Sequence, residues 1–246
     1  MARIRRLAHA PITEAIFDFR IALPPAFEVT TFDPLRARLA DRYPTVQERR
    51  SFEARFAFKE GKPAQPETRG GLDGYVFRSA DNLSAAQFRL DGFTYNRLAP
   101  YTSWDQLMPE ALALWDTYVE TTRPEAVTRV AVRYVNRLRI PAAGGLSKYL
   151  VVLPPRFPGT PQHLAAYLMR VSSHDPESAY HANITHALEP KPGTAEASVI
   201  LDIDVYTVSD LDLESRTLAP ILETMRTIKN EVFFGTITEE MARQYE

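Results

Sequence analysis

Residues 128–140, TRVAVRYVNRLRI, largely alternate between apolar side chains at even positions and arginines at odd positions. The even-numbered positions, here called the apolar parity, carry the large apolar side chains: Val130, Val132, Tyr134, Leu138 and Ile140. Because successive side chains of a strand point to opposite faces, the pattern predicts a β-strand with one buried face and one polar face. A sheet built from such strands needs a cover on one side only, as is common in antiparallel sheets.

The first half of the chain repeats this alternation and adds helical segments. Further strands are predicted by period-two patterns: 12–23, 51–59, 74–79 and 84–90. A short helix is expected within 32–44, with Asp33 as its N-cap and Pro34 in its first turn. Apolar side chains at helical spacing over 104–124, ending at Pro124, predict a long amphipathic helix.

The second half shows the same order of elements. A proline-rich insert at 153–162 follows the first strand, three strand-like segments come next, and 218–234 carries a helical apolar stripe, with Thr217 ahead of Pro220 as its start. Short echoes fall in the same order in both halves: LDGFTY (90–95) and LDIDVY (201–206), YTSWD (101–105) and YTVSD (206–210), FRI (19–21) and LRI (138–140). These echoes indicate an internal duplication.

Together the patterns predict an α+β fold. Two pseudo-duplicated units, each a strand, an insert, three strands and a helix, would form a curved antiparallel sheet with two long helices on one face. The units would span 1–125 and 126–246 and form one compact structure.

Composition excludes several classes of site and location. The chain has no cysteine, which excludes disulfides, thiolate nucleophiles and cysteine-ligated metal centres. Its net charge of −2 gives no overall attraction to nucleic acid or anionic lipid. No stretch approaches the roughly 18 apolar residues of a membrane span, and the start MARIRRLAHAPI lacks the apolar segment of a signal peptide. We therefore expect a cytoplasmic protein that does not bind membranes.

A row of arginines occupies the polar parity of the 128–140 strand. Alternate residues lie about 6.6 Å apart, which roughly matches the spacing of backbone phosphates. Polar faces of the neighbouring strands add Arg55, Lys59 and Gln87. The candidate binding residues are Arg89, Arg129, Arg133, Arg137 and Arg139, and nucleic acid is one candidate ligand.

The same polar faces also carry acids that could neutralise the arginines. Cross-strand pairs with Glu14, Asp18, Glu53 or Asp91 would each contribute about 0.2 to 1 kcal/mol. Tyr95 could stack on a nucleic-acid base. Tyr134 is expected in the core, since it lies on the apolar parity.

Histidines form the other candidate site. Four of them, His163, His174, His181 and His186, precede Asp202 and Asp204, which lie on the polar parity of LDIDV. A hydrolytic metal centre at His181, Asp202 and Asp204 is a third alternative. Against it, His181 and His186 are five residues apart and should point to opposite faces, and His174 is expected in a turn. We therefore expect no metal or cofactor.

Familiar catalytic signatures are absent from the sequence. It contains no G-x-x-x-x-G-K-[ST], G-x-G-x-x-G, G-x-S-x-G or H-E-x-x-H motif. The segment 61–71 is expected to be a hairpin connection, because Pro63 and Pro66 remove amide donors that a phosphate loop uses. A metal-free RNA-cleaving site with a histidine base and an arginine stays open.

PITEAIFDFR (11–20), together with Asn230, Phe233, Ile237 and Thr238 in KNEVFFGTIT (229–238), resembles an uncharacterised, sporadically distributed bacterial family. Its members share an opening Pro-Ile-x-Glu-Ala strand and a C-terminal helix that runs into a Phe-x-x-x-Ile-Thr segment. The two motifs stand near opposite ends of the chain, so the resemblance spans nearly its full length. It implies no activity and no site residue, and the patchy distribution implies an accessory locus such as a phage-defence module.

These observations favour a non-enzymatic binding or regulatory protein of a bacterial accessory system, with a protein partner. Homo-oligomerisation is also compatible with them. The alternative is a nucleic-acid-binding or RNA-processing protein that uses the arginine row.

Overall fold

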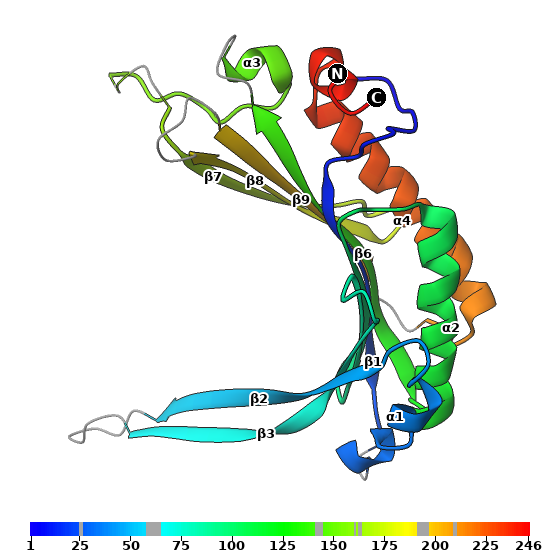
Figure 1. The fold of residues 1–246 in the computed structure, drawn as a ribbon. Helices are drawn as coiled ribbons and strands as arrows, with labels where there is room; N and C mark the ends of the chain where they lie inside the picture. Colours follow the sequence, from blue (N-terminus) through cyan, green and yellow to red (C-terminus); the bar gives the residue numbers. More distant parts are fainter. Residues whose placement is uncertain are drawn as a thin grey trace.

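The structure is a computed structural model of the chain. It describes residues 1–24, 27–57, 65–140, 145–159, 161, 164–190, 197–208 and 211–246, and of these the side chains of 52–57, 65–69 and 190 are left aside. One antiparallel sheet runs through the described residues (Figure 1). Its nine strands are β1 (Ile12–Ala22), β2 (Thr45–Ala57), β3 (Gln65–Arg78), β4 (Ser84–Arg89), β5 (Gly92–Leu98), β6 (Ala126–Ile140), β7 (Tyr167–His174), β8 (Tyr180–Pro190) and β9 (Ala197–Thr207).

The order of the strands across the sheet relates the two halves of the chain. It runs β2-β3-β4-β5-β1-β6-β9-β8-β7. In each half the first strand pairs with the last, as β1 does with β5 and β6 with β9, and the remaining strands follow outward. The two first strands, β1 and β6, pair with each other at the centre. The two halves therefore share one topology, and the first half has one additional strand.

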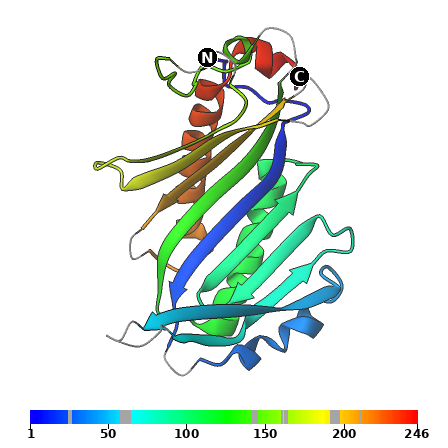
Figure 2. The same cartoon turned by 90° about the vertical axis from the view of Figure 1, so that its left-hand side faces the viewer.

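Two long helices, α2 (Trp104–Thr122) and α4 (Ser215–Thr236), pack on one face of the sheet (Figure 1). The short helical elements are η1 (Val29–Phe32), α1 (Leu35–Arg38), α3 (Leu146–Tyr149) and α5 (Glu239–Arg243). The opposite face, here called the open face, is turned toward the viewer in Figure 2, where the long helices lie behind the sheet. Both ends of the curved sheet bend toward the open face (Figure 1).

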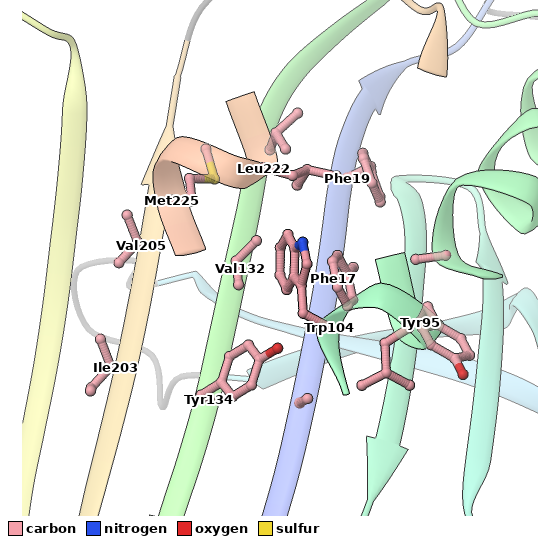
Figure 3. Packing of buried hydrophobic residues seen from close by; sticks show 14 of the residues in the cluster. Phe17, Phe19, Tyr95, Trp104, Val132, Tyr134, Ile203, Val205, Leu222 and Met225 are labelled. Carbon is pink, nitrogen blue, oxygen red and sulfur yellow. The ribbon is translucent and has the colours of Figure 1, made fainter. Parts of the chain in front are cut away.

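The core lies between the sheet and the two long helices. As the alternation predicts, Phe17 and Phe19 of β1 and Val132 and Tyr134 of β6 are buried under the helices (Figure 3). Each such side chain contributes about 1.5 to 3 kcal/mol through its removal from water.

The character of the core differs along the sheet. In the first half it is aromatic: the ring of Trp115 stacks on Phe19 and on Tyr118, with centroid distances of 4.7 and 5.6 Å. In the second half it is mainly aliphatic where β9 faces α4, through these buried residues: Val199, Leu201, Ile203, Val205, Leu218, Leu222 and Met225.

The predicted fold class is confirmed, with one difference in the strand count. The pattern over 84–90 continues through a tight turn into β5, so the first half has four strands after its insert where three were expected. Leu90 and Asp91 form this turn. Gly92 follows at φ +150°, where any side chain would collide with the carbonyl of Phe19.

Several boundaries also differ from the sequence prediction. The helix expected within 32–44 is only α1, whose N-cap is Pro34; the Asp33 carboxylate instead accepts a hydrogen bond from the Tyr75 hydroxyl at 2.8 Å. Helix α4 begins at Ser215, ahead of the expected start, and contains Pro220 within it. Most of the expected connection over 61–71 belongs to β3, and its first residues lie outside the described chain.

Candidate functional site

The polar parity of β6 lies on the open face, as its sequence predicts. Arg133 stands opposite Asp204 of β9 and Ile16 of β1, and Arg129 stands opposite Arg20 of β1. The register therefore places the arginine row between two strands that both carry acids.

Asp18 of β1 is the centre of the resulting network. One of its carboxylate oxygens accepts hydrogen bonds from Arg89 Nη2 at 3.0 Å and Thr94 Oγ1 at 2.7 Å. The other accepts from Arg129 Nη1 at 3.0 Å and Arg20 Nε at 3.1 Å. Burial by itself would raise the pKa of Asp18, but Arg89, Thr94, Arg20 and Arg129 hold it below its usual value. The carboxylate therefore stays ionised and neutralises the inner part of the face.

Arg129 links the two halves through this network. Its Nη2 donates to both carboxylate oxygens of Asp204, at 2.9 and 3.1 Å, while its Nη1 is bonded to Asp18. Its guanidinium also lies 4.5 Å from the centroid of the Tyr206 ring. Arg89 is enclosed further, with a side chain only 6% exposed. Neither side chain presents a free charge to solvent.

The outer arginines are more accessible. Arg133 donates to both oxygens of Asp202, at 2.8 and 2.6 Å, and Arg137 donates to Glu189 at 2.8 Å. Their side chains are 47% and 49% exposed. Arg139 lies near the end of β6, where its backbone amide donates to the Tyr245 hydroxyl at 3.0 Å. The exposed part of the row therefore runs from Arg133 through Arg137 to Arg139.

Of the acids predicted to pair with the arginine row, two form ion pairs with arginines. Asp18 pairs with three arginines, and Asp91 pairs with Arg89 and Arg20. Glu14 accepts a hydrogen bond from the Asn96 amide at 2.7 Å. The side chains of Glu53, Arg55 and Lys59 lie outside the described part of the structure.

Three partners of the arginine row were not predicted from the sequence: Asp202, Asp204 and Glu189. The alternation of LDIDVY placed both aspartates on a polar face, but the sequence contains no signal that β9 is the neighbour of β6.

The tyrosines lie away from the open face. Tyr134 is fully buried, as predicted, and Tyr95 is buried on the helix side of β5. Neither ring is available for stacking with a nucleic-acid base.

The histidines do not converge on one point. His181 lies on the open face and stacks on Tyr206, with a centroid distance of 4.9 Å, while His186 is buried on the other face. Burial lowers the pKa of His186 to about 4. His174 is the last residue of β7, not part of the following turn, and stacks on His181 at 5.9 Å; His163 lies outside the described residues. No group of three His, Asp or Glu side chains suited to a metal ion is present in the described part of the chain.

A cavity on the helix side was not anticipated from the sequence. It has a volume of about 410 Å³ and lies between the N-terminal segment, the start of α2, β6 and α4. Lys229 lines it, although only 8% of this residue is exposed. Both motifs of the family resemblance reach this cavity, through Pro11 and Ile12 at one end of the chain and Asn230 and Phe233 at the other.

Comparison with protein-family models, with curated proteins and with solved structures found no match. None of the helices in the described residues is both long and apolar enough to span a membrane.

Proposed function

We propose that the chain is a non-enzymatic binding protein of a bacterial accessory system, and that its open face binds a protein partner. The observation that carries the proposal is the charge-paired surface of a sheet whose long helices both lie on the other face (Figure 2). A broad polar sheet face can bind a partner through a complementary surface shape and through hydrogen bonds.

The pairing of charges favours a protein over a nucleic acid. A phosphate group would compete with Asp18, Asp202 and Asp204 for arginines that those carboxylates already contact. A protein surface carries both signs of charge and can therefore join these pairs without breaking them.

Apolar side chains between the ion pairs support the same partner class. Ile16, Val135 and Ile200 lie on the open face and are partly buried by their neighbours. Val135 stands between Glu14 and Asp202 in the strand register. Apolar positions enclosed by a polar rim are typical of protein interfaces.

Site-specific crosslinking tests the proposal. Photoreactive p-benzoylphenylalanine at Val135 or Ile200, in cells of the source organism, should yield one defined adduct with a protein. The same residue at Thr224, exposed on the outer side of α4, is the control. Adducts of equal yield from Thr224 would contradict docking on the open face. An adduct of twice the chain mass would identify the partner as a second copy.

Nucleic-acid binding is the second candidate, since Arg133 and Arg137 are half-exposed. Its signature is a fall of log affinity with log salt, at a slope near −0.7 per phosphate contact for single strands. The purified protein should then carry nucleic acid that a high-salt wash removes, as measured by the 260 to 280 nm absorbance ratio. A folded Arg133→Glu variant that retains the nucleic acid would count against this face.

A further inference from the structure

Lys229 is a buried cation for which no acidic partner is found among the described residues. Its Nζ lies 3.9 Å from the centroid of the Tyr134 ring. Burial, followed by the charge of Arg226, lowers its pKa to about 7. Both influences disfavour the ammonium form, which an anion placed beside Nζ would stabilise.

None of the ionisable groups described around Lys229 pairs with its ammonium group as an anion. They are Arg226 of α4 with its partner Glu223, Tyr134 on β6, Tyr101 just before α2 and Asp105 in its first turn, and Arg6 and Arg5 in the N-terminal segment. Arg5 is already paired with Glu239 and Glu246. Burial raises the pKa of Tyr134 and of Tyr101, which keeps both phenols neutral. Asp105 is exposed to solvent.

Arg226 is the other cation of α4 at the cavity, and it is paired with an acid. Arg226 lies 5.3 Å from the centroid of the Trp104 ring, and its partner Glu223 also accepts a hydrogen bond from the Trp104 indole. The N-terminus of α2 reaches the same cavity through Ser103, Trp104 and Asp105. The first amides of a helix have no intrahelical acceptor and carry partial positive charge.

Part of the cavity wall is aromatic, and the N-terminal segment adds aliphatic side chains. Tyr101 and Tyr134 meet edge to face, with ring centroids 5.7 Å apart and hydroxyl oxygens 3.3 Å apart. Phe233 and Phe234 of α4 complete this side. The volume of the cavity falls within the range of about 300 to 1,000 Å³ that is typical of small-molecule sites.

We propose that this cavity binds a small organic carboxylate with a flat apolar body. The carboxylate pairs with Lys229 near the start of α2, and the apolar body lies against the aromatic wall formed by Tyr101, Phe233 and Phe234. This site lies on the helix side of the sheet and is independent of a partner on the open face.

A matched pair of probes tests the charge requirement. Benzoate and benzamide have nearly the same shape, but only benzoate carries a charge. In isothermal titration calorimetry at pH 6, benzoate should bind about tenfold or more tightly than benzamide. Equal affinities would contradict the proposal. Binding of inorganic phosphate without binding of benzoate would also overturn it, because the site would then select an oxyanion instead of an organic acid.

The dependence on pH tests the role of Lys229 directly. Since binding requires the ammonium form, benzoate affinity should fall as pH rises above 7, and binding at pH 8 should take up a proton from the buffer. Titrations in two buffers of different ionisation enthalpy measure this uptake. Unchanged affinity between pH 6 and pH 8.5 would exclude Lys229 as the counter-charge.

Two lysine variants separate the cavity from a general effect of charge. Lys229→Met should lose benzoate binding by about tenfold or more and keep its circular dichroism spectrum. Lys148→Met is the matched control, because Lys148 also lies over a tyrosine ring, 5.4 Å from Tyr149, but pairs with Glu240 and is exposed. If Lys229→Met binds benzoate as the native chain does, the proposal fails.

Discussion

The two halves of the molecule place different residues at matched positions of their long helices. Counted from the first residue of each helix, Trp115 of α2 corresponds to Arg226 of α4, and Tyr118 corresponds to Lys229. Trp115 and Tyr118 fill the aromatic core of the first half, whereas Arg226 and Lys229 line the cavity that α4 and β6 form with the N-terminal segment and the start of α2. Pro109 and Pro220 also correspond, which supports the match.

This difference shows that topology and site are determined separately. The alternation of apolar residues gives the strands of both halves one apolar face, and in the folded chain both halves have the same strand order and a covering helix. At the two matched helical positions, rings pack in the core of the first half, whereas cations lie beside a cavity at α4.

The largest contrast is expected at the first matched pair. Trp115→Ala should lower the free energy of unfolding by about 3 to 5 kcal/mol, because it leaves a cavity in the aromatic core and removes a hydrogen bond to the Leu213 carbonyl. Arg226→Ala should cost about 1 kcal/mol or less, since its ion pair with Glu223 is partly exposed. Urea denaturation of both variants measures this; equal losses would remove the distinction between the halves.

The next contrast compares two acids of the open face. Asp18→Asn should destabilise the protein by about 3 kcal/mol, because it removes the buried carboxylate that pairs with the enclosed Arg89 and leaves that arginine only the exposed Asp91. Asp202→Asn should cost about 1 kcal/mol or less, since Arg133 can turn to solvent. Because the pKa of Asp18 is lowered in the folded state, its contribution is complete above its unfolded pKa of about 4 and is lost as pH falls through the folded value. A stability profile from pH 2 to 7 that is unchanged in Asp18→Asn would contradict this role.

A smaller effect of opposite sign is expected at Lys229. Lys229→Met should stabilise the protein by about 2 kcal/mol at pH 6, because it removes an uncompensated buried charge. The folded pKa of about 7 lies below the unfolded value of 10.5, so native stability should rise with pH between these values. The advantage of the variant should therefore shrink across the same window. Denaturation at pH 6, 8 and 9.5 measures this, with Tyr118→Met as the matched variant that should destabilise at every pH.

The smallest effect is expected at the edge of the arginine row. Arg137→Gln should change the free energy of unfolding by less than about 0.5 kcal/mol, since Arg137 and Glu189 are both about half exposed. Thermal denaturation at low and high salt measures this change. A loss comparable to that of Asp18→Asn would show that the outer row is as enclosed as the inner network.

Local periodicity predicted most of the fold. The alternation in β1 and β6 and the apolar stripes of α2 and α4 gave the element types, the one-sided sheet and the buried position of Tyr134. The ends of helices and strands were predicted less accurately where tertiary contacts determine them. Asp33 was expected to cap a helix but bonds to Tyr75, and β5 was missed because a two-residue turn interrupts an otherwise continuous pattern.

The candidate sites were predicted less completely. Parity placed Arg129, Arg133 and Arg137 on one face, and Asp18 and Asp91 were among the expected partners. The partners on β8 and β9 were not, because periodicity contains no information on which strands are neighbours. His181 and His186 were correctly expected on opposite faces, since this follows from the strand period alone.

The sequence by itself determined which residues form strands and helices and which side of each is apolar, because these properties depend on the period of neighbouring side chains. The tertiary structure decided which charges meet. Pairing β6 with both β1 and β9 converted a row of arginines into a neutralised network. Packing α4 beside the N-terminal segment and the start of α2 left Lys229 enclosed without a carboxylate partner among the described residues, an arrangement that depends on contacts between segments far apart in the chain.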